Sequence, residues 1–131
     1  MVAAGPAFPG PILLESNRGD GREMQELDRA FLLAALDGLN TNICITDTVT
    51  NRIVYANENM KRIFGLAGPE GSICWEVLQD GMDGLCPFCR IHRLQAMDGE
   101  QSCVWDEMNT LTGRTYKNFD CLIRWEGRDY Y

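Results

Sequence analysis

Residues 42–57 read NICITDTVTNRIVYAN, and this stretch decides the fold of the chain. Two short runs of β-branched and apolar residues, 42–47 and 52–56, flank the turn residues 48–51, a pattern that predicts a β-hairpin. Asn57 follows directly and is suited to cap a helix, because its side-chain oxygen can accept a hydrogen bond from a free N–H of the first turn. Glu58 would then lie at the positive end of that helix. The stretch therefore predicts strand, turn, strand and helix in immediate succession.

The residues that follow predict short helices and then more strands. The capped helix should end at Gly65, and two further helices are predicted over 72–79 and 90–97. Strands are predicted over 102–109 and 114–125, joined by a turn at 110–113, and a last strand begins at Asp129. This order predicts an α+β fold in which the helices gather against one antiparallel sheet.

The first 40 residues divide into a tail and a helix. Residues 1–21 are rich in glycine and proline, which predicts a flexible tail or linker. Over residues 22–40, apolar side chains recur at helical spacing along two stripes, formed by Met24, Leu27, Phe31 and Ala34 and by Leu32, Leu36 and Leu39. Either one wide core face buries both stripes, or one stripe meets a partner chain. We expect a homodimer through the helix Arg22–Leu39, with residues 41–131 forming the domain and ending within its last strand.

Charge and composition exclude several kinds of partner. The 131 residues carry a net charge of −7, which disfavours binding to nucleic acid and to anionic membrane surfaces. No apolar run approaches the roughly 20 residues of a transmembrane helix. The N-terminus has no basic start and is interrupted by prolines, so we do not predict a signal peptide. We therefore expect a cytoplasmic protein whose six cysteines are reduced.

Several motifs follow one another in a fixed order along the chain. They are the Asp47 turn leading into Arg52-Ile53-Val54-Tyr55-Ala56-Asn57, then Ile63-Phe64-Gly65, then Gly71-x-x-Cys74-Trp75-Glu76-Val77-Leu78, and finally Ile123-x-Trp125-Glu126-Gly127-Arg128. In this order they resemble the PAS family of sensor domains, and the resemblance extends from Leu36 to Tyr131.

The resemblance implies a PAS-like antiparallel five-stranded sheet with short helices packed on one face and an N-terminal amphipathic helix. PAS domains bind small ligands or cofactors between sheet and helices, or dimerise as signalling modules. They usually regulate a fused histidine kinase, diguanylate cyclase or transcription regulator. We therefore expect a sensory domain of a bacterial-type signalling protein, with its effector outside this chain. The alternatives are a protein-interaction module with a closed core and a metal-stabilised structural domain.

We do not expect an enzyme. The chain has one histidine, and it lacks a Gly-rich phosphate loop and a Ser-His-Asp set. No catalytic residues are therefore predicted.

The segment 71–92 contains the most distinctive residues. Cys74, Cys86, Cys89 and His92 have the spacing C-x11-C-x2-C-x2-H, and thiolate and imidazole are the ligands that zinc prefers. The segment is similar to a PAS subgroup in which a Cys-Trp/Tyr-Glu-Val-Leu helix precedes a Cys-Pro-x-Cys element. Cys86 and Cys89 could instead form a redox-sensitive disulfide, and a helix beginning after Pro87 would lower their pKa values. The third interpretation is that the cysteines are small buried apolar residues.

Other cofactors fit this segment less well than zinc. An iron–sulfur cluster would require four cysteines, and the residue that would pair with Cys74 is Gly71. A photoactive flavin is disfavoured, because Ile73 and Trp75 replace the Asn and Arg that flank the cysteine in light-oxygen-voltage domains. Haem bound through His92 is disfavoured because a lone histidine is more often a surface residue.

Strand alternation suggests a ligand pocket but leaves its register open. In one register the pocket is lined by Cys44, Thr46, Ile53, Tyr55, Ile63 and Val77, with Asn118 and Asp120 aimed at a ligand. In the opposite register Phe119, Cys121 and Ile123 point inward instead. The same apolar residues could also form a filled core with no ligand.

Overall fold

The computed structural model describes residues 21–97 and 102–131, so most of the predicted tail lies outside the described residues. The elements in chain order are α1 (Gly21–Asp37), β1 (Cys44–Thr46), β2 (Ile53–Ala56), α2 (Glu58–Phe64), α3 (Cys74–Leu78), α4 (Ile91–Gln95), β3 (Ser102–Met108), β4 (Thr115–Cys121), β5 (Ile123–Trp125) and β6 (Arg128–Tyr130). Each predicted helix and strand has a counterpart in this order.

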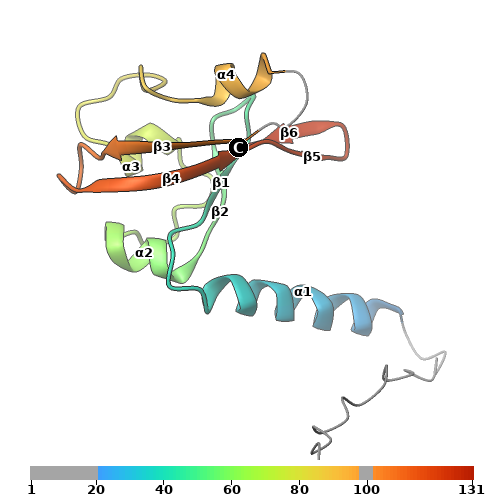
Figure 1. Cartoon of the computed structure of the whole chain (residues 1–131). Coiled ribbons are helices and arrows are strands. Elements are labelled where there is room, and N and C mark those ends of the chain that lie inside the picture. The colour runs from blue at the N-terminus through green and yellow to red at the C-terminus, as the bar shows by residue number, and fades with distance from the viewer. Residues whose placement is uncertain (1–20, 98–101) are drawn as a thin grey trace, which may run out of the picture.

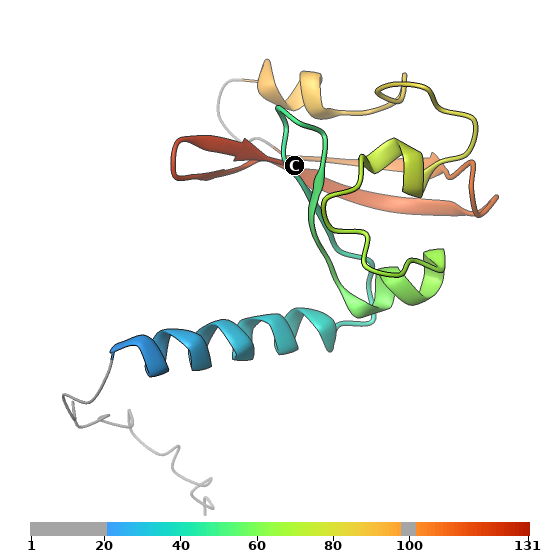
Figure 2. The same cartoon turned by 180° about the vertical axis from the view of Figure 1, so that it is seen from behind.

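Helix α1 projects from the rest of the molecule, as both views show (Figures 1 and 2). From Gln25 to Phe31 every side chain is exposed. Its last turn is tied to the domain: Asp37 accepts hydrogen bonds from the hydroxyl of Tyr55 at 2.9 Å and from the N–H of Glu58 at 3.1 Å. The helix is therefore held at its C-terminal end.

The turn between β1 and β2 is built on one carboxylate. Asp47 Oδ1 accepts hydrogen bonds from the N–H groups of Val49 and Thr50 at 2.8 and 3.0 Å, and Asn51 closes the turn with φ 55°. The N–H of Thr50 holds the pKa of Asp47 below its usual range, and the paired Arg128 guanidinium adds to this effect. The same ion pair ties this turn to β6.

Asn57 is the predicted N-cap of α2, and its buried side chain connects three segments. Its Oδ1 accepts from the N–H of Met60 in α2 at 3.1 Å and from the N–H of Ile43 at 3.0 Å. Its Nδ2 donates to the carbonyls of Leu36 in α1 at 3.1 Å and Thr41 at 2.8 Å. One amide thus fixes the end of α1, the loop into β1 and the start of α2.

The described strands form three two-stranded sheets, β1–β2, β3–β4 and β5–β6, rather than one continuous five-stranded sheet. The strand predicted over 114–125 is interrupted at Leu122, which separates β4 from β5. Backbone hydrogen bonds between Thr46 and Tyr131, at 2.7 and 2.8 Å, connect the end of β1 to the residue after β6. The turn before β6 has positive φ at Glu126 and Gly127, as a two-residue hairpin requires.

The two faces of the β3–β4 pair have different surroundings. Helix α3 lies behind this pair in Figure 1 and in front of it in Figure 2. The opposite face carries exposed apolar side chains, which include Val104, Met108 and Phe119, and β5 adds Ile123 and Trp125. Within residues 21–97 and 102–131, no helix combines the length and the apolar character that crossing a bilayer demands.

We expect Asn57→Ala to lower the free energy of unfolding by about 2–4 kcal/mol, because the cap is lost and buried backbone groups lose their partners. Urea denaturation followed by circular dichroism measures the change. The control is Asn40→Ala, at an exposed position in the loop that follows α1. Equal stability of the two variants would contradict the connecting role of Asn57.

Candidate ligand and thiol site

Alternate residues of β3 and β4 form a polar inner face that turns toward the α3–α4 segment. The half-buried positions are Cys103, Trp105 and Glu107 on β3 and Tyr116, Asn118 and Asp120 on β4. This is the register in which Asn118 and Asp120 point inward, whereas Phe119, Cys121 and Ile123 are exposed. The inner face contacts residues of the segment 74–95 through the side chains described below.

Glu107 accepts hydrogen bonds from three side-chain amides. The donors are Gln79 from the loop after α3, Asn109 at 3.4 Å and Asn118 at 2.6 Å. Asn109 also donates to the carbonyl of Leu78 at 2.8 Å, which fastens the end of α3 to the strand pair. The carboxylate of Glu107 is therefore held by protein donors.

Asp120 joins β3 to the end of the described chain. Its Oδ2 accepts hydrogen bonds from the indole N–H of Trp105 and from the hydroxyl of Tyr131. Burial raises the pKa of Tyr131, and the hydrogen bond to Asp120 raises it further. The hydroxyl of Tyr131 therefore stays protonated and donates a hydrogen bond to Asp120 throughout the physiological pH range.

The indole ring of Trp105 is the contact point between the sheet and the segment that carries the cysteines. The guanidinium carbon of Arg90 lies 4.8 Å from its centroid, within the range of a cation–π contact. The ring of Phe88 lies 6.1 Å away at a tilt of 45°. Arg90 Nε and the hydroxyl of Tyr116 are buried without a hydrogen-bond partner.

The pocket residues predicted on the first hairpin take different positions. Thr46 and Ile53 are buried, and the Cys44 thiol lies 3.9 Å from the Thr46 hydroxyl. The hydroxyl of Tyr55 is bonded to Asp37, so it anchors α1. Ile63 and Val77 are half-buried on α2 and α3. Their part in binding a ligand stays a prediction.

Cys86 and Cys89 lie in one turn, whereas His92 is exposed on α4. The N–H of Cys89 donates to the carbonyl of Cys86 at 2.9 Å, so this turn presents both thiols. Burial is the main cause that raises the pKa of Cys74 to about 12, and the charges of Cys89 and Cys86 contribute to the same rise.

The prediction that a helix N-terminus lowers the pKa values of Cys86 and Cys89 is wrong. Burial raises both, because removing a thiolate from water disfavours the charged form. In the described part of the chain, no three Cys, His, Asp or Glu side chains are grouped in a way that could hold a metal ion. The metal and redox roles of Cys74, Cys86, Cys89 and His92 stay predictions.

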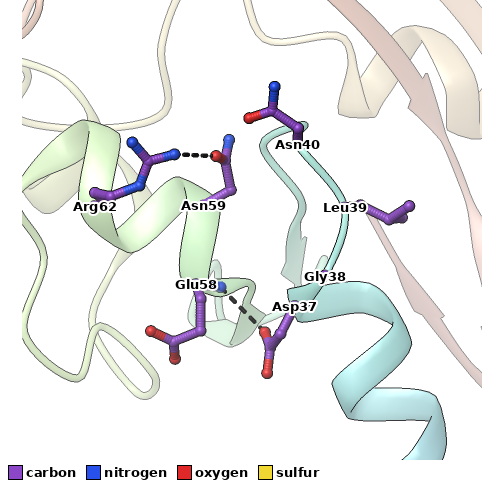
Figure 3. A pocket seen from close by; sticks show the side chains of 7 residues that line it. All are labelled: Asp37, Gly38, Leu39, Asn40, Glu58, Asn59 and Arg62. Carbon is purple, nitrogen blue, oxygen red and sulfur yellow. Dashed lines mark hydrogen bonds between the residues drawn. The ribbon is translucent and has the colours of Figure 1, made fainter.

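A separate surface hollow of about 330 Å³ lies at the end of α1 (Figure 3). It is lined by Asp37, Gly38, Leu39, Asn40, Glu58, Asn59 and Arg62. Its polar side chains bond to neighbours within the hollow, with Arg62 donating to Asn59 at 2.6 Å. None of the pocket residues predicted from the sequence lines it.

Comparison with known proteins agrees with this architecture. The family model described as "PAS domain" matches residues 30–101, more than half of the 131 residues. This chain belongs to the PAS domain family. PAS domains are generally sensory modules without catalytic activity, and the polar inner face lies between sheet and helices, where the family binds ligands.

A solved structure shares the fold. The crystal structure of the PAS domain of an HTR-like protein from Haloarcula marismortui is 18% identical, with a TM-score of 0.57. The match covers 82% of this chain and 89% of that chain. No curated protein matches the sequence.

Sequence reasoning did not identify Trp105, Glu107 and Tyr116 as residues of the inner face. It also missed Arg90 and Tyr131, which contact that face. The available signal was the pairing of β3 with β4. Once Asn118 and Asp120 are taken as inward, antiparallel pairing brings Trp105 opposite Asn118 and Cys103 opposite Asp120.

At neutral pH we expect iodoacetamide to alkylate Cys74 at least about tenfold more slowly than the exposed Cys121, because the reactive thiolate becomes rarer as the pKa rises. Mass spectrometry of peptides at successive times measures both rates. In urea the two rates should become similar. Equal rates in the folded protein would show that Cys74 is not protected.

The raised pKa also predicts how stability depends on pH. The pKa of Cys74 is 9.0 without the fold and about 12 with it, so the unfolded chain releases the proton first. The stabilisation is complete below pH 9 and is lost as the pH rises towards 12. In urea denaturation at increasing pH, Cys74→Ala should lose less stability over this range than the unsubstituted chain.

Proposed function

We propose that this chain is a cytoplasmic PAS sensory domain that binds a small molecule or responds to redox state. The signal passes through a change in dimer packing to an effector outside this chain, such as a histidine kinase, a diguanylate cyclase or a transcription regulator. The three small sheets would act as one five-stranded sheet, joined through Thr46 and Tyr131 and through the short break at Leu122.

The observation that supports sensing is the polar character of the inner face. A module that only dimerises is most stable with an apolar closed core, since each buried polar group must be matched by a partner. Here two carboxylates, Glu107 and Asp120, lie half-buried between the sheet and the cysteine segment. This arrangement favours a ligand-responsive interior over the alternative of a closed interaction module.

A chain of contacts leads from the cysteine segment to the last strand. Arg90 and Phe88 contact Trp105, Trp105 and Tyr131 donate to the same oxygen of Asp120, and Tyr131 pairs with Thr46. A shift of segment 74–92 against the sheet would displace Trp105 and change the hydrogen bonds that hold the last strand. That movement is the signal that we propose.

Exposed apolar side chains support dimerisation through Arg22–Leu39. Leu27, Phe31 and Leu32 are 69%, 72% and 62% exposed. Most helical stability in proteins comes from packing of an apolar face, and the described residues leave these side chains of α1 uncovered. Leu27 and Phe31 belong to one stripe and Leu32 to the other, and a second α1 would bury them in a symmetric contact.

The three thiols suggest a second kind of signal and carry the resemblance to the Cys-Pro-x-Cys subgroup. In the redox form, an oxidant such as hydrogen peroxide takes two electrons from Cys86 and Cys89, forming one disulfide and two waters. In the metal form, zinc replaces the thiol protons of Cys74, Cys86 and Cys89, and His92 would have to turn inward.

Elemental analysis and an absorption spectrum separate these roles. The protein is purified anaerobically and without an affinity metal. About one zinc or iron per chain, lost in Cys86→Ser and kept in Cys121→Ser, would support a metal centre. A colourless, metal-free protein would leave redox chemistry or an organic ligand, and retained folding in a chelator would argue against the metal-stabilised structural domain.

We expect the chain to be a dimer at micromolar concentration and Phe31→Glu to weaken dimerisation at least about thirtyfold, because a charge would be buried in the apolar contact. Sedimentation equilibrium measures the association. Val49→Glu is the control, because Val49 is 76% exposed in the turn before β2. A monomeric unsubstituted chain, or equal effects of the two substitutions, would overturn the proposed interface.

A further inference from the structure

The inner face leaves two hydrogen-bonding groups unpaired. Arg90 Nε and the Tyr116 hydroxyl are both buried and have no partner. Arg90 itself is half-buried, but its Nε is shielded from water. An unsatisfied buried donor in a native structure calls for an explanation. Among residues 21–97 and 102–131, no carboxylate lies within ion-pair distance of Arg90.

Both unpaired groups belong to neighbours of Trp105. Arg90 lies over Trp105, which is paired directly with Asn118. Tyr116 is two residues before Asn118, so it is the diagonal neighbour of Trp105, at roughly 7–8 Å between Cα atoms. The ring of Phe64 stacks on Tyr116 at 5.7 Å, which fixes the phenol in place.

The unpaired groups show which kind of hydrogen-bonding partner a ligand would have to supply. The carboxylates already have protein donors: Gln79 and Asn118 for Glu107, and Trp105 for Asp120. The unpaired groups are a guanidinium N–H, which can only donate, and a phenol, which can donate. What this face lacks is therefore an acceptor, and the unpaired positive charge favours one that is negative.

We propose that Arg90 and Tyr116 bind the carboxylate of a small organic acid, whose body lies against the aromatic rings of Trp105 and Phe88. Arginine binds carboxylates through two parallel hydrogen bonds, and the indole holds the guanidinium in place by a cation–π contact. The rings supply the apolar surface that small-molecule sites share. This inference rests on the proposed ligand-sensing function and names the class of ligand.

Arg90 lies in the segment whose movement would carry the signal. It directly precedes α4 and follows Cys89, so a carboxylate drawn between Arg90 and Tyr116 would pull this segment toward β4. The same movement acts on Trp105 and hence on Asp120. Binding and signalling would then use one set of contacts.

The test compares carboxylates with their neutral and cationic counterparts. Acetate, butyrate, succinate, benzoate and phenylacetate are added at millimolar concentrations, each beside its amide, with benzylamine as the cation. The melting temperature and titration calorimetry report binding. We expect at least one carboxylate to bind and its amide to bind at least about tenfold more weakly, the factor expected for a lost charge-assisted hydrogen bond.

Substitutions identify the residues. Arg90→Gln should weaken binding of that carboxylate at least about tenfold and Tyr116→Phe about threefold or more. Arg93→Gln removes the same charge from an exposed position on α4 and should leave binding unchanged.

Three outcomes would overturn this inference. One is equal binding of a carboxylate and its amide, and another is equal loss in Arg90→Gln and Arg93→Gln. In both cases the proposed ligand-sensing function would survive with another ligand class. The third is no binding by any carboxylate, amide or amine, which would also count against the ligand-sensing function.

Discussion

The side-chain amide of Asn57 is the interaction on which the rest of the structure depends. It is fully buried, and its two donors and two acceptor bonds are all satisfied by backbone groups from separate segments. Only a carboxamide offers this combination in one side chain, because a carboxylate lacks the donors and an apolar side chain would leave the carbonyls unpaired. The register of β1 with β2, the start of α2 and the exit of α1 all follow from this geometry.

The β3–β4 pair has an unusual distribution of polarity. Its face toward the helices combines Glu107 and Asp120 with aromatic side chains. Its opposite face carries exposed Phe119 and Val104 beside the exposed Asp106–Lys117 ion pair, whereas an ordinary half-buried sheet turns its apolar side chains inward. The inner polar groups are tolerated because they bond to one another, as Asp120 does with Trp105 and Tyr131. A fold that places its hydrogen-bonding groups inside in this way gives up stability for a specific interior.

Local chemistry explains how much of this could be predicted from the sequence. The hairpin, the Asn57 cap and the helix end at Gly65 depend on neighbouring residues, so the sequence predicted them correctly. The strand register was left open because either set of alternate side chains in 115–125 could face the helices. Only the packing of the sheet against residues such as Gln79 and Arg90 shows which set does so. The thiol pKa values were predicted in the wrong direction, since burial depends on the assembled fold and outweighs a local helix end. The Asp120–Tyr131 contact was missed because it depends on the tertiary placement of the last strand.

The attachment of α1 through its final turn makes this helix a lever. Its 17 residues span roughly 25 Å at the usual rise of an α-helix. A rotation of about 10° at the Asp37 attachment would therefore displace the far end by roughly 4 Å, a large movement from a small change in the hydrogen bonds of Tyr55 and Glu58. Any rearrangement inside the domain that reaches this turn is mechanically amplified before it reaches whatever the helix contacts.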